Sequence, residues 1–220
     1  MLLYTEMIKS VKGKRTYRTA LRKEQAQLTR RRILDAGRRL LAGGTYSSLT
    51  MGEIAKEAGV AYQTVYSNFG TKLQLARDII ESGFPHVEDA LKLLDQLRDS
   101  PDDPELWLRT VARVSRRIYE PCADLNRFMR ESGDPSLLAR YRQSEEQRFI
   151  GITQQSGLEE VLERSGRLRP GKSASEALVT IWALSGPDLY SQLVFEKGWT
   201  PTHYEEWLGD ALINMLLEPA

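Results

Sequence analysis

Apolar residues recur at helical spacing along this chain, and the clearest recurrence falls between residues 50 and 72. Four apolar residues at i, i+3, i+4 and i+7 predict one buried face of a short helix. They are Met51, Ile54, Ala55 and Ala58. A second short helix is predicted from Tyr62 onward, because Val65 and Phe69 stand one turn apart on its inner face. The pattern therefore indicates two consecutive short helices.

The residues around these apolar positions mark where each helix starts and stops. Thr50 and Glu53 stand three apart, a spacing at which each side chain caps the backbone of the other at a helix start. Gly59 suits the left-handed turn that commonly ends a helix, and a connector of about three residues follows, as a helix-turn-helix requires. Thr71 and Gln74 predict a second capping box for a third helix. These signals together predict a helix-turn-helix.

The rest of the chain also has a helical pattern, so we expect an all-α fold. Residues 29–42 predict a helix that braces the motif, and the helix from Lys72 ends near Gly83 and Pro85. No alternating β pattern follows this point. We expect a basic N-terminal arm over 1–28, a three-helix helix-turn-helix domain over 29–82 and a C-terminal helical-bundle domain over 83–220.

Two apolar helices, over 173–196 and 201–217, are predicted at the C-terminus. Gly186-Pro187 should kink the first of them, because proline removes a backbone hydrogen bond. Inward-facing residues are expected to be Leu178, Ile181, Trp182 and Leu189 in the first helix and Tyr204, Leu208, Ala211 and Met215 in the second. These helices either complete the core or form a four-helix seam between two copies of the chain, and the residues alone favour the core.

The net charge of +1 hides a strong asymmetry along the chain. Residues 1–32 carry ten basic and two acidic side chains, a net charge of +8, against −7 over the remainder. A basic arm ahead of a helix-turn-helix supplies sequence-independent attraction to phosphates. A solvated, disordered tail is the alternative and is favoured for residues 1–17, whereas the residues from Arg18 onward favour helix and extend the first helix backwards.

A helix-turn-helix holds its second helix in the major groove of DNA. Gln63 suits adenine and Thr64 suits either base class, whereas Tyr62, Tyr66 and Lys72 suit phosphates. The full set of candidate DNA contacts is Arg30, Arg31, Thr50, Tyr62, Gln63, Thr64, Tyr66, Ser67, Asn68 and Lys72. The alternative is a helical hairpin with ordinary surface polar groups.

The motif resembles the tetracycline-repressor (TetR) family of bacterial regulators over about residues 29–80. The residues that carry the resemblance are Thr50, Ile54, Ala55, Ala58, Gly59, Val60, Thr64, Tyr66, Phe69, Lys72 and Leu75. The resemblance implies a homodimeric DNA-binding repressor released by a small ligand, with the two C-terminal helices as the dimer seam. Many members have serine where this chain has Ala61, so the start of the second helix lacks a side-chain N-cap.

The second domain offers candidates for a ligand pocket but does not identify the ligand. Helical-bundle ligand sites are largely apolar with few polar groups. The aromatic candidates are Trp107, Phe128, Tyr141 and Trp182, although an aromatic residue at helical spacing is more often part of the core. Glu145 and Glu146 are expected on a solvated face, and Cys122 is expected to be a buried structural residue rather than a redox sensor.

Several classes of protein receive little support from the sequence. A single cysteine and two distant histidines argue against disulfides and metal sites, and no cofactor motif occurs. No apolar run reaches the 18 or so residues of a membrane span, and the first ten residues are too polar for a secretory signal. Catalytic motifs are also missing, so we expect a cytoplasmic protein that is not an enzyme.

The sequence therefore predicts a ligand-responsive regulator that binds a near-palindromic, double-stranded DNA operator as a homodimer. The helix over 72–82 carries Lys72 at one end and the second domain at the other, so we expect it to couple effector to DNA. One alternative is a helical small-molecule carrier or enzyme whose helix-turn-helix is merely structural. Another is a DNA-binding protein governed by a protein partner instead of a small molecule.

Overall fold

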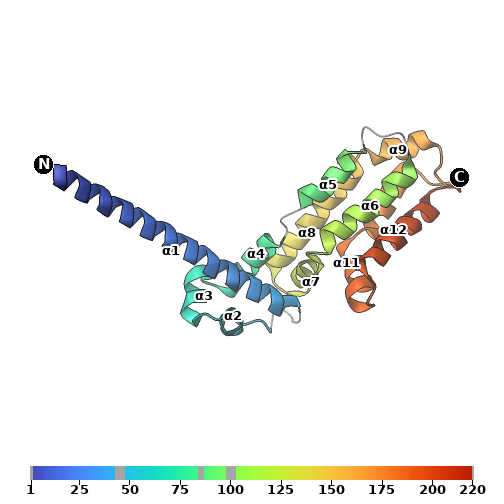
Figure 1. The fold of residues 1–220 in the computed structure, drawn as a ribbon. Coiled ribbons are helices and arrows are strands. Elements are labelled where there is room, and N and C mark those ends of the chain that lie inside the picture. Colours follow the sequence, from blue (N-terminus) through green and yellow to red (C-terminus); the bar gives the residue numbers. More distant parts are fainter. Residues whose placement is uncertain (1, 43–47, 84–86, 98–102, 220) are drawn as a thin grey trace. The chain divides into compact units, whose positions relative to one another are not determined.

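The computed structural model describes residues 2–42, 48–83, 87–97 and 103–219, with side chains in the first helix described from residue 21 to residue 41. These ranges form α-helices and two π-helical turns, and within them no strand occurs. One isolated antiparallel bridge joins Leu168 to Leu217. The predicted all-α fold is confirmed (Figure 1). In the described part of the chain, no helix is both long and apolar enough to span a membrane.

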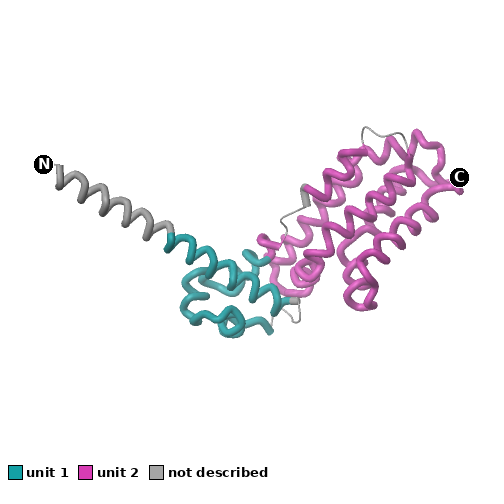
Figure 2. Tube along the Cα trace, viewed as in Figure 1, with its two compact units in different colours: residues 1–79 teal, residues 80–220 magenta. Residues whose placement is uncertain are grey.

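The chain divides into two compact units, residues 1–79 and residues 80–220 (Figure 2). The first unit contains α1 (Leu2–Ala42), α2 (Met51–Ala58), α3 (Tyr62–Phe69) and most of α4 (Lys72–Ser82). The last residues of α4 belong to the second unit, so one continuous helix crosses the boundary between the units.

Helix α1 is longer than the sequence pattern suggested. It starts at Leu2 and runs for 41 residues, so the helix expected over 29–42 extends backwards through the basic arm. The disordered tail favoured for residues 1–17 is therefore wrong for all but residue 1, which lies outside the described residues. No proline interrupts this stretch, and proline is the residue that most strongly breaks a helix.

The core of the first unit brings α1, α2, α3 and α4 together around the predicted apolar faces. Its buried side chains include Ile33, Ala36, Leu41, Ile54, Ala55, Ala58, Val65, Phe69, Leu75, Ala76 and Ile79. Gly37 allows α1 to approach α4 closely, because a Cβ atom at this position would lie 2.5 Å from Cδ1 of Ile79. The helix-turn-helix is thus held by buried apolar side chains that it shares with α1 and α4.

The second unit is a bundle built from the remaining helices. Its elements are α5 (Val87–Asp95), α6 (Pro104–Tyr119), α7 (Ala123–Glu131), α8 (Pro135–Ile150), a π-helical turn (Gly151–Gln155), α9 (Leu158–Ser165), α10 (Ala174–Leu184), α11 (Pro187–Tyr190), a second π-helical turn (Ser191–Glu196) and α12 (Pro201–Leu216). Helix α6 packs against both α5 and α12, and α7 packs against α8 and α11. Pro85, one of the expected stop signals before this unit, lies outside the described residues.

Four helix starts in this unit carry side-chain caps. Asp103 and Asp134 each accept two backbone hydrogen bonds and precede a proline at the first helical position. Ser173 and Glu176 form a reciprocal capping box, and the hydroxyl of Thr200 accepts from His203 N. Such caps satisfy backbone N–H groups that have no partner within the helix.

Two expectations about the C-terminal helices are wrong in detail. Gly186-Pro187 does not kink one helix: α10 ends at Leu184 and α11 begins at Pro187. The buried face of α12 also follows a different register from the predicted one and comprises Tyr204, Leu208, Gly209, Leu212 and Leu216. Met215 is 46% exposed. Both Leu212 and Met215 fit a helical apolar stripe, and packing against α6 selects the former.

Candidate functional site

Helix α2 is fixed at both ends by the interactions that the sequence predicts. The Thr50 hydroxyl accepts from Glu53 N at 3.1 Å, and the Glu53 carboxylate accepts from Thr50 N at 3.0 Å. Gly59 adopts the left-handed conformation, with φ of 64°, and its N–H donates to carbonyls of the preceding turn. The orientation of α2 is therefore set by local hydrogen bonds as well as by its buried face.

Helix α3 buries one face and leaves the other exposed. Val65 and Phe69 lie in the core, whereas Tyr62 and Tyr66 are 51% and 58% exposed. Gln63 is exposed and Thr64 is half-buried. Ala61 makes no side-chain cap, as expected from its missing hydroxyl. The candidate base-reading residues thus lie at the start of a short helix whose position depends on packing.

The side chains of two candidate DNA contacts on α3 donate hydrogen bonds to a backbone carbonyl of the same helix. The Ser67 hydroxyl donates to Thr64 O at 3.1 Å, and Asn68 Nδ2 donates to the same carbonyl at 2.7 Å. The Ser67 hydroxyl proton is thereby used and its oxygen remains an acceptor, whereas Asn68 keeps its second N–H as well as its Oδ1 for another partner. Lys72, at the first turn of α4, is half-buried and also has a partner within the protein.

Arg30 and Arg31 are neighbours in sequence but differ in their surroundings. Arg30 Nη2 lies 2.8 Å from Asp78 Oδ2, and its guanidinium carbon lies 4.8 Å from the centre of the Phe69 ring. Arg31 is exposed. Asp78 also accepts from Gln74 Nε2 at 2.9 Å. The predicted capping box therefore forms only in part: Gln74 N donates to the Thr71 hydroxyl, but the Gln74 side chain bonds to Asp78. Arg30 therefore joins α1, α3 and α4.

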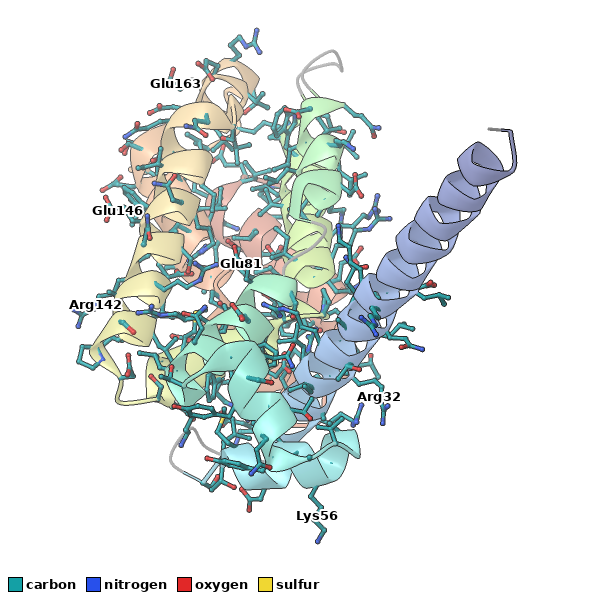
Figure 3. All side chains as sticks on the ribbon, turned by 90° about the vertical axis from the view of Figure 1, so that its left-hand side faces the viewer. Arg32, Lys56, Glu81, Arg142, Glu146 and Glu163 are labelled. Carbon is teal, nitrogen blue, oxygen red and sulfur yellow. The ribbon has the colours of Figure 1, made fainter. Side chains whose placement is uncertain are left out.

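Two other arginines of α1 hold the end of α2, a role that sequence reasoning missed. Arg32 Nη2 donates to Ala58 O at 2.7 Å, and Arg39 Nε lies 2.9 Å from the Glu57 carboxylate. A cationic side chain at a helix C-terminus satisfies terminal carbonyls and complements the helix dipole. The run of basic residues in α1 is the sequence feature from which contacts to the C-terminal end of α2 could have been predicted. Figure 3 shows the Lys56 side chain pointing away from α2.

The second unit contains a cavity of about 680 Å³, lined by side chains from α5 to α9 and by Ser185. Trp107 lines it, whereas Phe128, Tyr141 and Trp182 are outside its lining. Phe128 is buried in the core. Tyr141 donates to Asp188 at 3.1 Å, and Trp182 packs edge-on against Phe149 with ring centres 5.5 Å apart. These three aromatic residues are structural neighbours of the cavity.

An ion pair lines one part of the cavity, and sequence reasoning missed it. Arg148 Nη2 lies 2.7 Å from Glu145 Oε2, and Arg148 Nη1 donates to Trp182 O at 2.8 Å. Glu145 was expected on a solvated face, but its side chain is only 20% exposed. Glu146 is exposed, and Figure 3 shows it pointing outward from α8, as does Arg142. Adjacent helical residues point in different directions, so only one glutamate of the pair reaches Arg148.

The C-terminal helices expose apolar side chains on the surface of the unit. Val179, Phe195 and Met215 are each about half exposed. Trp199 packs edge-on against Trp207 at 5.6 Å and lies 4.3 Å from the ring of His203, measured between ring centres. Exposed apolar side chains mark an interaction site where they form one contiguous patch.

Known proteins resemble this chain most clearly over the first unit. The model of the bacterial regulatory proteins of the tetR family matches residues 33–79. The HTH-type transcriptional regulator AcrR of Shigella flexneri is 38% identical over 89 residues, 40% of each chain. The HTH-type transcriptional regulator AlkX of Mycobacterium tuberculosis is 37% identical over 73 residues, 33% of this chain and 30% of AlkX. The matched segment thus spans less than half of either relative.

The fold agrees with this resemblance over a larger part of the chain. The structure of NalD, the secondary repressor of the MexAB-OprM multidrug efflux pump in Pseudomonas aeruginosa, covers 89% of this chain and is itself fully covered. The TM-score is 0.60 at 19% identity, which shows a shared fold. The capped helix-turn-helix thus lies within the segment, residues 33–79, that matches the model of the bacterial regulatory proteins of the tetR family.

Proposed function

We propose that this chain is a transcriptional repressor that binds a near-palindromic DNA operator as a homodimer and is released by a small molecule. The observation that carries this proposal is the exposed face of α3, whose opposite face is anchored in the core of the first unit by Val65 and Phe69. The relatives AcrR and AlkX are HTH-type transcriptional regulators, and NalD is a repressor. These relationships support DNA binding by the first unit.

The contacts that we propose follow the surroundings of each side chain. Gln63 and Thr64 read base edges, because they lie at the start of the helix that enters the major groove. Tyr62, Tyr66 and the exposed Arg31 contact phosphates, and Thr50 and Lys72 place helix starts near the DNA backbone. Ser67 contributes as an acceptor and Asn68 through its second N–H and its Oδ1, whereas Arg30 holds α1 against Asp78 and acts by positioning.

The second unit supplies the proposed effector site and the proposed dimer seam. A cavity of about 680 Å³ lies within the range of small-molecule sites. The seam is formed by residues 173–196 and 201–217, whose outer surface exposes Phe195 and Met215. The functional division that we propose is the arm over 1–28, the DNA-binding domain over 29–82 and the effector and dimerisation domain over 83–220. Helix α4 joins the last two and couples them.

The test is selection of bound sites from random double-stranded DNA by the purified protein, read by sequencing. We expect an enriched inverted repeat, because a two-fold dimer binds two half-sites related by the same symmetry. Affinity should fall steeply with salt and should drop when Tyr66 is replaced by alanine. Arg142→Ala is the matched surface control, since this side chain points outward from α8 (Figure 3). No enrichment at low salt from folded protein would reject DNA reading.

The cavity itself favours one alternative, a helical small-molecule carrier whose helix-turn-helix is only structural. Such a carrier would bind ligand without binding DNA. The same selection experiment separates the two functions, because the carrier predicts ligand binding and no enriched sequence.

A further inference from the structure

The cavity of the second unit is elongated and follows one side of α6. Trp107 and Tyr119 both line it and lie twelve residues apart on this helix, which corresponds to about 18 Å at 1.5 Å per residue. Between them the lining from α6 is mainly aliphatic, from Val111, Val114 and Ile118. Helix α8 contributes only polar or charged lining residues, which are Arg140, Gln143, Ser144, Glu145, Gln147 and Arg148. The side of the cavity formed by α6 therefore fits an extended apolar group.

One part of the cavity presents two neutral polar groups. Tyr119 and Asn126 line it and are only 5% and 4% exposed. The turn between α6 and α7 links them, because Cys122 N donates to Tyr119 O at 3.0 Å and Asn126 Nδ2 donates to Cys122 O at 3.4 Å. Within the described residues, neither Tyr119 Oη nor Asn126 Oδ1 has a hydrogen-bond partner.

These two oxygen atoms differ from polar atoms that are sealed in the core. The Tyr204 hydroxyl is unpaired and out of reach of a water molecule. Tyr119 Oη and Asn126 Oδ1 are also unpaired but remain accessible. Since both residues are buried apart from the cavity that they line, the accessible side of each group faces that cavity. A phenol donates one hydrogen bond and an amide oxygen accepts one, so the pair complements a hydroxyl group.

The charged residues that line the cavity have no net charge. Its described lining includes two acidic and two basic residues, namely Asp95, Arg140, Glu145 and Arg148. Arg148 donates to Glu145, to Trp182 O and to the Ser185 hydroxyl, so most of its donors are occupied. Burial raises the pKa of Tyr119, which keeps its hydroxyl neutral. Arg140 is exposed, whereas Glu145 and Arg148 are largely buried and paired with each other. An ionic group enclosed beside this pair would therefore lose its hydration without gaining a buried counter-charge.

We propose that the effector is an uncharged, elongated molecule that is apolar over most of its length and ends in a hydroxyl group between Tyr119 and Asn126. The ligand hydroxyl accepts from Tyr119 Oη and donates to Asn126 Oδ1, while the apolar chain lies along Val111 and Val114 toward Trp107. This inference rests on the proposed function, because it names the class of molecule that the regulator senses.

The experiment is calorimetric titration of the full chain with four ligands of equal chain length. They are 1-decanol, its methyl ether, decanoate and decyltrimethylammonium. We expect 1-decanol to bind at least tenfold more tightly than either ion. The ether accepts a hydrogen bond but cannot donate one, so it should bind about three- to tenfold more weakly than the alcohol. Equal or tighter binding of either ion would overturn the proposal without any need for a variant.

A pair of tyrosine variants locates the hydroxyl site. Tyr119→Phe should weaken 1-decanol binding about three- to tenfold and should remove most of the preference for the alcohol over the ether. Tyr204→Phe is the matched control, because the Tyr204 hydroxyl is buried and Tyr204 does not line the cavity. The affinity of this variant for 1-decanol should stay within about twofold of the wild-type value. An unchanged preference in Tyr119→Phe would refute the assigned site.

The outcome of this titration is independent of DNA binding. If selection recovers an operator but 1-decanol shows no Tyr119-dependent binding, the effector class is wrong and the regulatory function stands. If 1-decanol binds as expected but no DNA sequence is enriched, the ligand site stands and the regulatory function fails.

Discussion

Tyr204 places a phenol hydroxyl in the core of the second unit without a hydrogen-bond partner. An unpaired buried polar group costs about 1–3 kcal/mol, so Tyr204→Phe should raise the free energy of unfolding by about 1 kcal/mol. Thermal melts should then shift upward by a few degrees. Tyr141→Phe is the contrasting variant, because it removes a hydrogen bond to Asp188 and should lower stability. A loss of stability in Tyr204→Phe would show that its hydroxyl has a partner, such as a bound water.

Adjacent arginines on α1 should have different effects when each is replaced by methionine. Arg30→Met removes the ion pair with Asp78 and the contact with Phe69. It should lower the free energy of unfolding by about 1 kcal/mol, discounted for the partial exposure of Arg30. Arg31→Met should leave stability unchanged and reduce the slope of log affinity against log salt by about 1, because one phosphate contact is lost. Chemical denaturation and DNA titration at several salt concentrations separate these effects. Similar results for the two variants would contradict the assigned roles.

Single residues were predictable where their partners lie close in sequence. Thr50 and Glu53 are three residues apart, and their capping box forms as expected. Glu145 was misplaced because its surroundings depend on α10 and on the turn before α11, through the bonds from Arg148 to Trp182 O and Ser185. A single sequence shows that a glutamate is on a helix, but it does not show which distant carbonyl fixes the neighbouring arginine.

At the scale of elements, helix ends were predictable because their partners lie close in sequence, whereas helix faces depend on distant residues. The starts of α6, α8, α10 and α12 follow local Asp-Pro, Ser-Glu and Thr-Pro signals. The buried face of α12 was partly wrong, because two apolar stripes were available and contact with α6 selected one of them. The cavity was missed for a similar reason. Its lining comes from α5 to α9, and only their packing shows which side chains meet there.

Helix α4 gives a prediction at the same scale, because it runs unbroken from Lys72 to Ser82 across the boundary of the two units. Arg77 and Glu81 are exposed on it, so glycine at both positions softens the helix without opening the core. Each glycine costs about 1 kcal/mol of helix stability relative to alanine. We expect the double glycine variant to retain operator affinity but to need a higher concentration of a ligand that releases the wild type. The double alanine variant is the control, measured in the same fluorescence anisotropy assay. Normal release in the glycine variant would reject α4 as the coupling element.

At the scale of the whole molecule, positive charge is concentrated in the first 32 residues and negative charge in the rest of the chain. The net charge is +8 over residues 1–32 and −7 beyond them. Raised salt should therefore weaken DNA binding while leaving self-association through an apolar seam intact, since burial of apolar surface does not depend on ion screening. Sedimentation of the free protein at low and high salt measures the second effect. A dimer that dissociates at high salt would place the seam on charged surface instead.

The proposed seam also predicts how single charges change assembly. A chain of 25.1 kDa should sediment as a dimer of about 50 kDa at micromolar concentration. Phe195 is 51% exposed on the C-terminal surface, and Phe195→Glu would bury a carboxylate in the seam of both copies. Because an unpaired charge in an apolar interface costs several kcal/mol, this variant should sediment as a monomer and bind its operator at least tenfold more weakly. Leu106→Glu is the matched control, since Leu106 is 41% exposed on α6 outside the proposed seam. It should remain dimeric. A wild-type monomer, or a dimer that survives Phe195→Glu but not Leu106→Glu, would move the interface away from the two C-terminal helices.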